Sequence, residues 1–312
     1  MIDLSVVIVS RDVRDLLERC LRSIRCGCVV ETLVVDAGSR DGSAELVAER
    51  FPDVRLLRSP ENLGFTRGNN WALRLARGRF VMLLNPDTEV EPDALDRMVA
   101  YLDAHPDVGA VGPMLRYPDG SVQSSRRRFP TPLTGFVEST VLERWLGGSG
   151  VVRDYRFADR PSDEPQEVDW LVGAALMVRR EALGQAGLLD ERFFMYSEEV
   201  DLCRRIRTAG WRIVYLPEAV VVHHEGRSSD QNLEARNVHF FESRFSYYAK
   251  HFGRGWALAL RAALLGHFGF LAAEESAKLL IGSQPDLRRS RLTMLRGVLR
   301  RQSGALVAAL RP

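Results

Sequence analysis

A short apolar run that ends in a turn constrains the fold of this chain more than any other feature. Residues 80–84 are all apolar, and five residues suit a buried strand better than a helix. The run stops at Asn85-Pro86-Asp87, a trio that favours a turn. In open α/β sheets ligands bind at the carboxyl ends of strands, where Asp87 would offer a carboxylate to a hard divalent cation and Asn85 would lie close by. An isolated turn of this type would be an ordinary strand end.

Strand-like and helix-like segments alternate along the first third of the chain. The apolar patterns predict strands at residues 4–9, 29–35 and 54–57, and helices at residues 16–24, from 44 onward and at 69–77. This alternation is typical of an α/β fold in which a mostly parallel, Rossmann-like sheet has helices on both faces. Asp36 follows the second strand, so we expect it at the same sheet edge as Asp87. Two acids at neighbouring strand ends are a more specific signal than either acid alone.

Residues 61–70 lie between these acids and contain two glycines, Gly64 and Gly68. The glycines would let a loop approach a ligand closely, and Arg67 could reach a phosphate, with Asn69 beside it. No G-x-G-x-x-G follows the first strand, and the chain contains no G-x-x-x-x-G-K-[ST]. These absences argue against a dinucleotide cofactor and against a P-loop nucleotide hydrolase.

Residues 112–165 are rich in Pro, Gly, Ser and Arg, and they include the triplet Arg126-Arg127-Arg128. We interpret this stretch as a long insertion in front of the site, a common place for substrate selection. The triplet is either a solvated face or a contact for the acceptor or a phosphate.

Residues 169–178 again predict a strand, which contains Trp170. Gly173 within it suggests close approach by a ligand or by backbone. Further on, Ser197 is a candidate N-cap for a helix that starts with Glu198 and Glu199. The two adjacent carboxylates follow an aromatic cluster at residues 193–196, which a purely structural role does not explain.

Two further features concern the end of this region. Asp201 can pair with Arg205 one helical turn later, which would be a sufficient structural role for it. Strand-like runs at residues 211–216 and 219–222 lead to His223. A histidine at a strand end, in a chain with Asp87 at another strand end, is a candidate metal ligand.

The remaining features concern compartment and surface. The four cysteines have no C-x-x-C or zinc spacing, so we expect reduced thiols in a cytoplasmic protein, and residues 1–4 show no secretory leader. The near-balance of 43 basic and 41 acidic residues points to no particular partner, and we expect no nucleic-acid partner. The apolar run at residues 256–273 is interrupted by Arg261, Gly266 and His267, and an arginine-rich segment follows it. This tail either packs on protein or lies on anionic lipid.

Taken in order, these motifs resemble glycosyltransferase family 2, the inverting GT-A enzymes, and in particular its bacterial rhamnosyltransferase-like members. The resemblance covers roughly residues 3–245. The motifs that carry it are residues 5–10, 34–39 with 41–43, 62–65 with 68–70, 84–88, 190–202 and 222–223.

The resemblance implies roles for several of these residues. Asp36 would bind the nucleobase, in a pocket also lined by Ser10 and Arg11. Asp87 would hold Mg²⁺ or Mn²⁺ on the donor diphosphate, and His223, or alternatively its neighbour His224, would complete that metal site. Glu199, next to Glu198, would be the general base. The remaining candidates are Arg67, Asn69 and Asn85 on the donor side, and Trp170, Gly173 and Asp201 on the acceptor side.

The resemblance also implies an activity, a GT-A fold and a division of the chain. The expected enzyme moves a sugar, with rhamnose from dTDP-rhamnose as the best guess, to a hydroxyl of a cell-surface polysaccharide or lipid-linked glycan. The alternative is an inactive nucleotide-sugar-binding or scaffold protein on the same fold. We expect the catalytic domain at residues 1–245, including the acceptor-side insertion at 112–165, and a helical tail at 246–312. The protein would be cytoplasmic, with peripheral contact at the inner face of the membrane as an open option.

Overall fold

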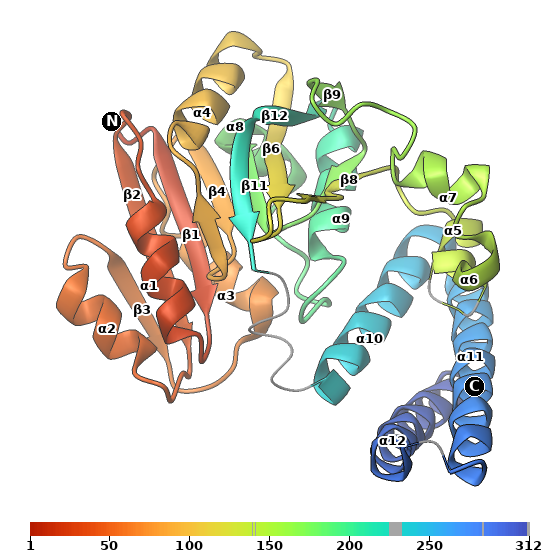
Figure 1. Ribbon diagram of the computed structural model, residues 1–312. Helices are drawn as coiled ribbons and strands as arrows, with labels where there is room; N and C mark the ends of the chain where they lie inside the picture. Colours follow the sequence, from red (N-terminus) through yellow and green to blue (C-terminus); the bar gives the residue numbers. More distant parts are fainter. Residues whose placement is uncertain (139, 141, 225–232, 283, 311–312) are drawn as a thin grey trace. The chain divides into compact units, whose positions relative to one another are not determined.

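The computed structural model describes residues 1–138, 140, 142–224, 233–282 and 284–310 (Figure 1). These residues belong to two compact units, and each is described by itself. The first unit consists of Met1–Phe129 and Arg156–Gln231, and the second of Pro130–Tyr155 and Asn232–Pro312.

A mixed β-sheet is the frame of the first unit. Its strands lie in the order β3-β2-β1-β4-β11-β6-β12-β5, with β7 paired to β6 and β9 paired to β12. Their bounds are β1 (Leu4–Ser10), β2 (Val30–Ala37), β3 (Arg55–Ser59), β4 (Phe80–Leu84), β5 (Thr88–Val90), β6 (Val108–Arg116), β7 (Val122–Gln123), β9 (Gln166–Glu167), β11 (Ala175–Arg179) and β12 (Arg212–His223). β3, β2, β1 and β4 are parallel, as are β6 and β12, whereas β11 is antiparallel to both β4 and β6. The predicted α/β class is confirmed, with one antiparallel strand joining two parallel groups.

Helices cover both faces of this sheet (Figure 1). They are α1 (Arg14–Ser23), α2 (Ser43–Arg50), α3 (Gly64–Leu73), α4 (Ala94–Ala104), α8 (Arg180–Ala186) and α9 (Glu198–Thr208). Successive side chains of a strand point to opposite faces. Ile8 of β1 shares an apolar cluster with Leu17 of α1 and Met98 of α4. Its neighbour Val9 meets α3, where a Cβ added to Gly68 would lie 2.8 Å from the Val9 side chain.

Three elements differ from the bounds that the sequence suggests. Helix α3 begins at Gly64, five residues before the predicted start at Asn69, so Arg67 lies on a helix rather than on the predicted loop. The strand predicted at residues 169–178 is broken into β10 (Trp170–Leu171) and β11, and β10 pairs with β8 (Arg126–Arg127). The two strands predicted at 211–222 are one strand, β12, whose register shifts between Leu216 and Val220. Pro217 lies in that shifted segment and has no N–H to donate to a ladder.

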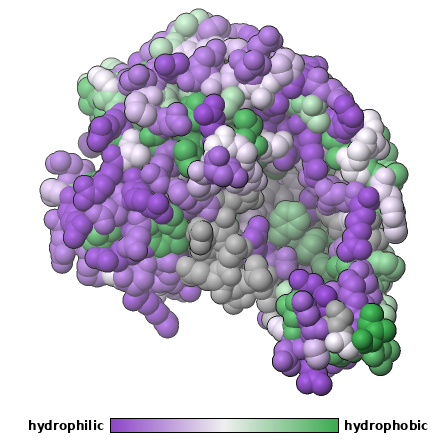
Figure 2. Space-filling view, in the orientation of Figure 1, coloured by the Kyte–Doolittle hydropathy of each residue, from purple (hydrophilic) through white to green (hydrophobic). Residues whose placement is uncertain are grey.

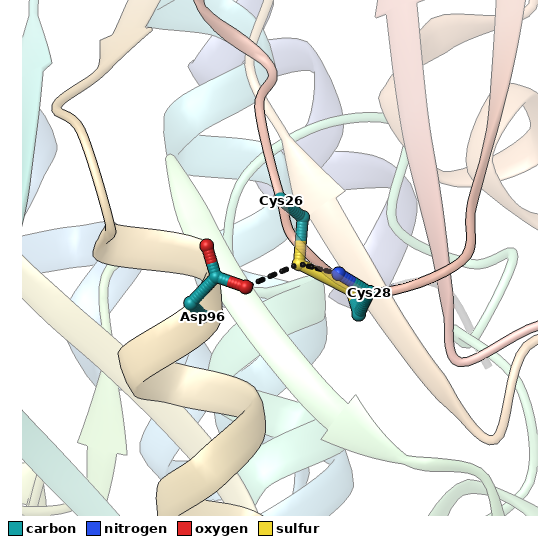
Figure 3. Close-up of side chains that lie close together, drawn as sticks. All are labelled: Cys26, Cys28 and Asp96. Carbon is teal, nitrogen blue, oxygen red and sulfur yellow. Dashed lines mark hydrogen bonds between the residues drawn. A yellow bond between two sulfur atoms is a disulfide. The ribbon is translucent and has the colours of Figure 1, made fainter.

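The cysteines correct one expectation. Cys26 and Cys28 form a disulfide in the segment between α1 and β2, so the prediction of four reduced thiols is wrong for this pair (Figure 3). Only one residue separates the two cysteines, and the chain turns between them so that their Cα atoms lie 5.1 Å apart. Cys20 and Cys203 are free and buried, as expected for reduced thiols.

The second unit is helical in the residues that the structure describes. Its helices are α5 (Pro132–Glu138), α6 (Glu143–Leu146), α7 (Gly150–Tyr155), α10 (Leu233–Phe252), α11 (Arg254–Leu280) and α12 (Pro285–Leu310). Tyr248 of α10 donates to the carbonyl of Thr131 at 2.7 Å, and Arg244 of α10 pairs with Glu138 of α5 at 2.8 Å. The expected boundary at residue 245 therefore falls inside α10, and residues 130–155 of the predicted insertion belong with the tail helices. Ser139 and Val141 of that insertion lie outside the described residues.

Helix α11 is long and apolar enough, by length and composition alone, to cross a membrane. The 18-residue window that meets this criterion has a mean hydropathy of 1.4, and 22% of it is buried. In Figure 2, hydrophobic side chains gather at the lower end of this helix among hydrophilic ones. Leu280 and Ile281 at its end are 88% and 81% exposed.

Candidate active site

The carboxyl ends of β1 and β2 bring Ser10 and Asp36 together. The two residues are direct partners in the parallel register of these strands. Asp36 is buried, and its Oδ2 accepts a hydrogen bond from the Ser39 backbone N–H at 3.2 Å. Its Oδ1 and the Ser10 hydroxyl oxygen are buried without a hydrogen-bond partner. Buried polar atoms normally have partners, so two orphans side by side indicate a place where a ligand would supply them. Arg11, the next residue, is exposed.

Asp87 follows the end of the next strand, β4. His223 stands at the end of β12, further along the sheet, and lies close to Asp87. β12 pairs with β5 so that His223 lies opposite Thr88. The Nε2 atom of His223 lies 3.4 Å from Oδ1 of Asp87 and 3.5 Å from Nδ2 of Asn85. Both Asp87 and His223 are buried, and Oδ1 of Asp87 has no hydrogen-bond partner.

Gln123 on β7 is a site residue that the sequence did not reveal. Its Oε1 lies 2.9 Å from Nδ1 of His223, and both side chains are buried. An amide oxygen only accepts, so Nδ1 carries a hydrogen, and Nε2 is the ring nitrogen that faces Asp87. Nε2 and the Asp87 carboxylate face each other across 3.4 Å. The turn residues Asp119 and Gly120 signal a hairpin at this position, but they do not indicate which residue would face His223.

The neighbouring histidine is turned away from this pair of acceptors. The Nε2 atom of His224 lies 2.7 Å from Oε1 of Glu89, which excludes His224 as the alternative partner of Asp87 in this arrangement. Its backbone N–H instead donates to the Asp87 carbonyl at 2.9 Å. On the other side of the turn, the Cys20 sulfur lies 3.6 Å from the Thr88 hydroxyl, and burial raises the pKa of this thiol to about 12. The Asn-Pro-Asp turn is therefore fixed from both sides.

Helix α3 carries the donor-side candidates Arg67 and Asn69. The Arg67 side chain is largely exposed, and its Nε lies 3.7 Å from Oε2 of Glu191. Asn69 is buried, its Nδ2 donates to the Phe65 carbonyl at 2.9 Å, and its Oδ1 has no partner. Asn70 makes two hydrogen bonds to the backbone of Leu189, at 2.8 and 3.0 Å. Helix α3 is thus attached to the segment that leads to Glu198 and Glu199.

Glu198 and Glu199 open helix α9 immediately after an unusual piece of backbone. Tyr196 and Ser197 both have positive φ values, 71° and 68°. Ser197 lies at the predicted N-cap position but makes no side-chain capping hydrogen bond, because the left-handed conformation replaces the usual extended one. One carboxylate oxygen of each glutamate is buried without a partner. Burial raises the pKa of Glu199 to about 7, and burial together with the charge of Glu199 raises the pKa of Glu198.

Gly173 and Ala174 connect the two groups of acids. A Cβ added to Gly173 would lie 3.2 Å from the Cβ of Glu199, so the group that approaches Gly173 is a side chain rather than the predicted ligand or backbone. The carbonyl of the next residue, Ala174, accepts a hydrogen bond from the Asn85 backbone N–H at 2.9 Å. Glu199 is therefore two short contacts away from the turn that carries Asp87.

Two acceptor-side candidates make structural contacts. Asp201 is fully buried and accepts a hydrogen bond from Nε of Arg205 at 2.9 Å. This is the contact within one helix that the i to i+4 spacing predicts. Trp170 is buried, and its indole N–H donates to the Arg128 carbonyl at 2.7 Å.

The arginine triplet is more than a solvated face. The Arg126 guanidinium lies over the Tyr215 ring at 5.0 Å and also donates to the Pro161 carbonyl at 2.7 Å. The Arg128 guanidinium lies over the Phe157 ring at 4.7 Å.

Residues 5–185 match the family described as Glycosyl transferase family 2. Over 306 residues the chain is 33% identical to an N-acetylglucosaminyl-diphospho-decaprenol L-rhamnosyltransferase of Mycobacterium tuberculosis, covering 94% of this chain and 97% of the relative. It is 23% identical over 256 residues to the rhamnosyltransferase WbbL of Escherichia coli, covering 78% of this chain and 89% of that protein.

Solved structures agree in fold. The mannosyltransferase PcManGT of Pyrobaculum calidifontis, in complex with GDP-Man and Mn²⁺, superposes with a TM-score of 0.54 at 21% identity, over 98% of this chain and 85% of that one. TarS 1–349 of S. aureus in complex with UDP-GlcNAc gives a TM-score of 0.54 at 15% identity, over 99% of this chain and 82% of that one.

Proposed function

Since the chain belongs to glycosyl transferase family 2 and is a glycosyltransferase, we propose that it is an inverting, metal-dependent enzyme that transfers L-rhamnose from dTDP-rhamnose to a hydroxyl of a lipid-linked glycan. The observation that carries the metal-dependent part is the buried approach of Asp87 Oδ1 to His223 Nε2 at 3.4 Å. The rhamnosyl donor and the lipid-linked acceptor rest on the printed name of the mycobacterial relative, which this chain matches over most of its length. A catalytically inactive scaffold on the same fold is the competing proposal.

The residues fit a divalent cation. A buried carboxylate oxygen and an imidazole nitrogen 3.4 Å apart can share a cation or a proton between them. A carboxylate and a neutral imidazole together suit Mn²⁺, while Mg²⁺ prefers oxygen ligands and water. In the proposed enzyme Asp87 and His223 hold the ion, Gln123 orients the His223 ring, and Asn85 lies within 3.5 Å of its Nε2. The bound ion would neutralise charge on the departing diphosphate.

The chain's own residues supply the remaining steps. The unpartnered Oδ1 of Asp36 can accept a hydrogen bond from the imide N–H of a thymine or uracil base, with Ser10 and Arg11 beside it. Glu199 takes the proton of the acceptor hydroxyl as the oxygen attacks the anomeric carbon and the bond to the diphosphate breaks. A single displacement from the opposite face inverts the anomeric configuration, so no enzyme nucleophile is needed. A carboxyl whose pKa is about 7 is well matched to proton transfer near neutral pH.

We further propose that the protein is cytoplasmic and contacts the inner face of the membrane through the second unit. Helix α11 ends in the exposed residues Leu280 and Ile281, and exposed arginines of α12 follow, among them Arg289, Arg296 and Arg300. Apolar side chains next to cationic ones are the combination that binds anionic lipid surfaces. A lipid-linked acceptor would be met at such a surface.

The first prediction concerns the orienting residue of the metal site. Gln123→Leu removes the acceptor for Nδ1–H, so the His223 ring loses its preferred tautomer, and we expect Mn²⁺ affinity to fall about 10- to 100-fold. Calorimetric titration with Mn²⁺ and nucleoside diphosphate measures it. Gln123→Glu keeps an acceptor oxygen and should retain most of the affinity. Equal affinities in Gln123→Leu and the parent protein would contradict this role.

The second prediction separates the two adjacent glutamates. Glu199→Gln should lower turnover by about 10²- to 10⁴-fold, the usual contribution of a general base, while the isosteric change Glu198→Gln should have a small effect. Because a base works only when deprotonated, kcat/KM of the parent should rise with pH through about 7, and this limb should vanish in Glu199→Gln. Full turnover in Glu199→Gln with loss in Glu198→Gln would assign the base to Glu198.

The third prediction identifies the donor. Thermal unfolding is followed with UDP-, GDP- and dTDP-sugars, with and without Mn²⁺ or Mg²⁺. A ligand at about 100 times its Kd stabilises the folded state by roughly 2.7 kcal/mol, so a metal-dependent rise in Tm is expected with dTDP-rhamnose. The rise should be lost in Asp36→Asn. A rise with dTDP-rhamnose but no transfer to polyprenyl-diphosphate-linked sugar would favour the scaffold, and a rise only with another sugar would overturn the donor assignment.

The fourth prediction concerns the membrane. The full chain should float with vesicles that contain anionic lipid and remain at the bottom of the gradient with neutral vesicles. Leu280→Ser combined with Ile281→Ser should weaken flotation several-fold, because these changes remove exposed apolar surface. Val29→Ser, which changes an exposed apolar residue of the first unit, is the matched control. Unchanged flotation in the double variant would show that these residues do not contact lipid.

A further inference from the structure

Outside the active site, the segment between α1 and β2 carries a second group of reactive side chains. Cys26 and Cys28 are joined as a disulfide, and Asp96 of α4 points at them (Figure 3). The Cys26 sulfur lies 3.1 Å from Oδ1 of Asp96. The same oxygen accepts a hydrogen bond from the backbone N–H of Gly27 at 2.8 Å.

This cysteine pair is accessible, in contrast to the other two cysteines. Both Cys26 and Cys28 are partly exposed and line an open surface cavity of about 460 Å³. The cavity is also lined by Ile24, Arg25, Val30, Thr32, Asp53 and Val54. Cys20 and Cys203 are buried, and burial raises the pKa of each thiol to about 12. A small thiol in solution can therefore reach the Cys26–Cys28 pair but not the other two sulfurs.

A purely structural role explains this disulfide poorly. A disulfide stabilises a protein mainly by restricting the unfolded chain, and the effect is smaller the shorter the closed loop is. Here the cross-linked residues are only two positions apart, so the loop is about as short as a loop can be. Moreover, a sulfur in a disulfide carries no hydrogen, so the approach of Asp96 gives no hydrogen bond in the oxidised form. The Cys26 sulfur can donate a hydrogen bond to Asp96 only when Cys26 is a thiol.

We propose that Cys26 and Cys28 form a reversible thiol–disulfide site that exchanges with small thiols, and that Asp96 accepts the S–H of Cys26 in the reduced form. The thiolate of a small thiol attacks one sulfur of the disulfide, forms a mixed disulfide and releases the other cysteine, which takes a proton from water. A second small thiolate attacks the mixed disulfide and releases the remaining cysteine, which is protonated in turn. Two small thiols are oxidised to their disulfide, and the protein pair gains two electrons and two protons.

The test uses the folded wild-type chain and mass spectrometry after alkylation with iodoacetamide. Without reductant we expect no alkylation. After incubation in glutathione buffers of increasing reducing strength, we expect alkylation of Cys26 and Cys28 together, and reoxidation by glutathione disulfide should reverse it. Cys20 and Cys203 should react only after unfolding and serve as internal controls. Alkylation of Cys26 and Cys28 without reductant, or only after unfolding, would overturn the proposal.

A pair of variants tests the role of Asp96. Asp96→Asn keeps an acceptor for Gly27 but replaces a charged acceptor by a neutral one. Half-reduction of the Cys26–Cys28 pair occurs at a certain ratio of the squared glutathione concentration to the glutathione disulfide concentration. We expect this ratio to rise about tenfold, because the thiol form loses a charge-assisted hydrogen bond. Asp53→Asn removes a carboxylate that lines the same cavity and should leave the ratio unchanged. No shift in Asp96→Asn, or an equal shift in both variants, would overturn this role. Binding of one Zn²⁺ per reduced chain that blocks reoxidation would make the group a metal site instead.

Discussion

The antiparallel pairing of β11 with β4 is the constraint on which the proposed active site depends. It joins two groups of parallel strands into one sheet, and its register places Ala175 opposite Leu84. Just before that pair, the hydrogen bond from Asn85 to Ala174 fixes the Asn-Pro-Asp turn against the chain that passes Glu199. Together with the hydrogen bonds of α3 to Leu189 and Phe194, this strand ties the donor-side acids to the candidate base.

Several side-chain oxygens of the proposed site are buried without a hydrogen-bond partner. Buried oxygens without partners occur on Ser10, Asp36, Asn69, Asp87, Glu198 and Glu199. Each such group costs about 1–3 kcal/mol in a folded protein, so their accumulation is unfavourable for folding alone. The surrounding hydrogen bonds of the turn, of α3 and of β12 hold them in place despite this cost. Such sites are where proteins trade stability for binding.

Much of this arrangement could be predicted from local patterns, and the exceptions share a cause. The strands that end at Ser10, Asp36 and Leu84 follow from apolar runs, and the parallel alternation is enough to bring their ends to one edge. The role of Gln123 does not follow from any local pattern, because its partner His223 lies 100 residues away. The contacts of Asp201 with Arg205 and of Trp170 with the Arg128 carbonyl differ in this respect, since only the first follows from local spacing along a helix. The early start of α3 at Gly64 depends on Phe194, another distant contact.

The second unit is assembled from two separate stretches of chain, and this affects how the protein can be divided. Residues 130–155 leave the first unit and return to it, and they are held by contacts to α10 such as those of Arg244 with Glu138 and Tyr248 with Thr131. A truncation at residue 245 would cut through α10 and remove Tyr248, which binds the Thr131 carbonyl just before α5. The helical part is therefore not a detachable tail. Clean removal would need two cuts, with residues 129 and 156 rejoined by a new linker.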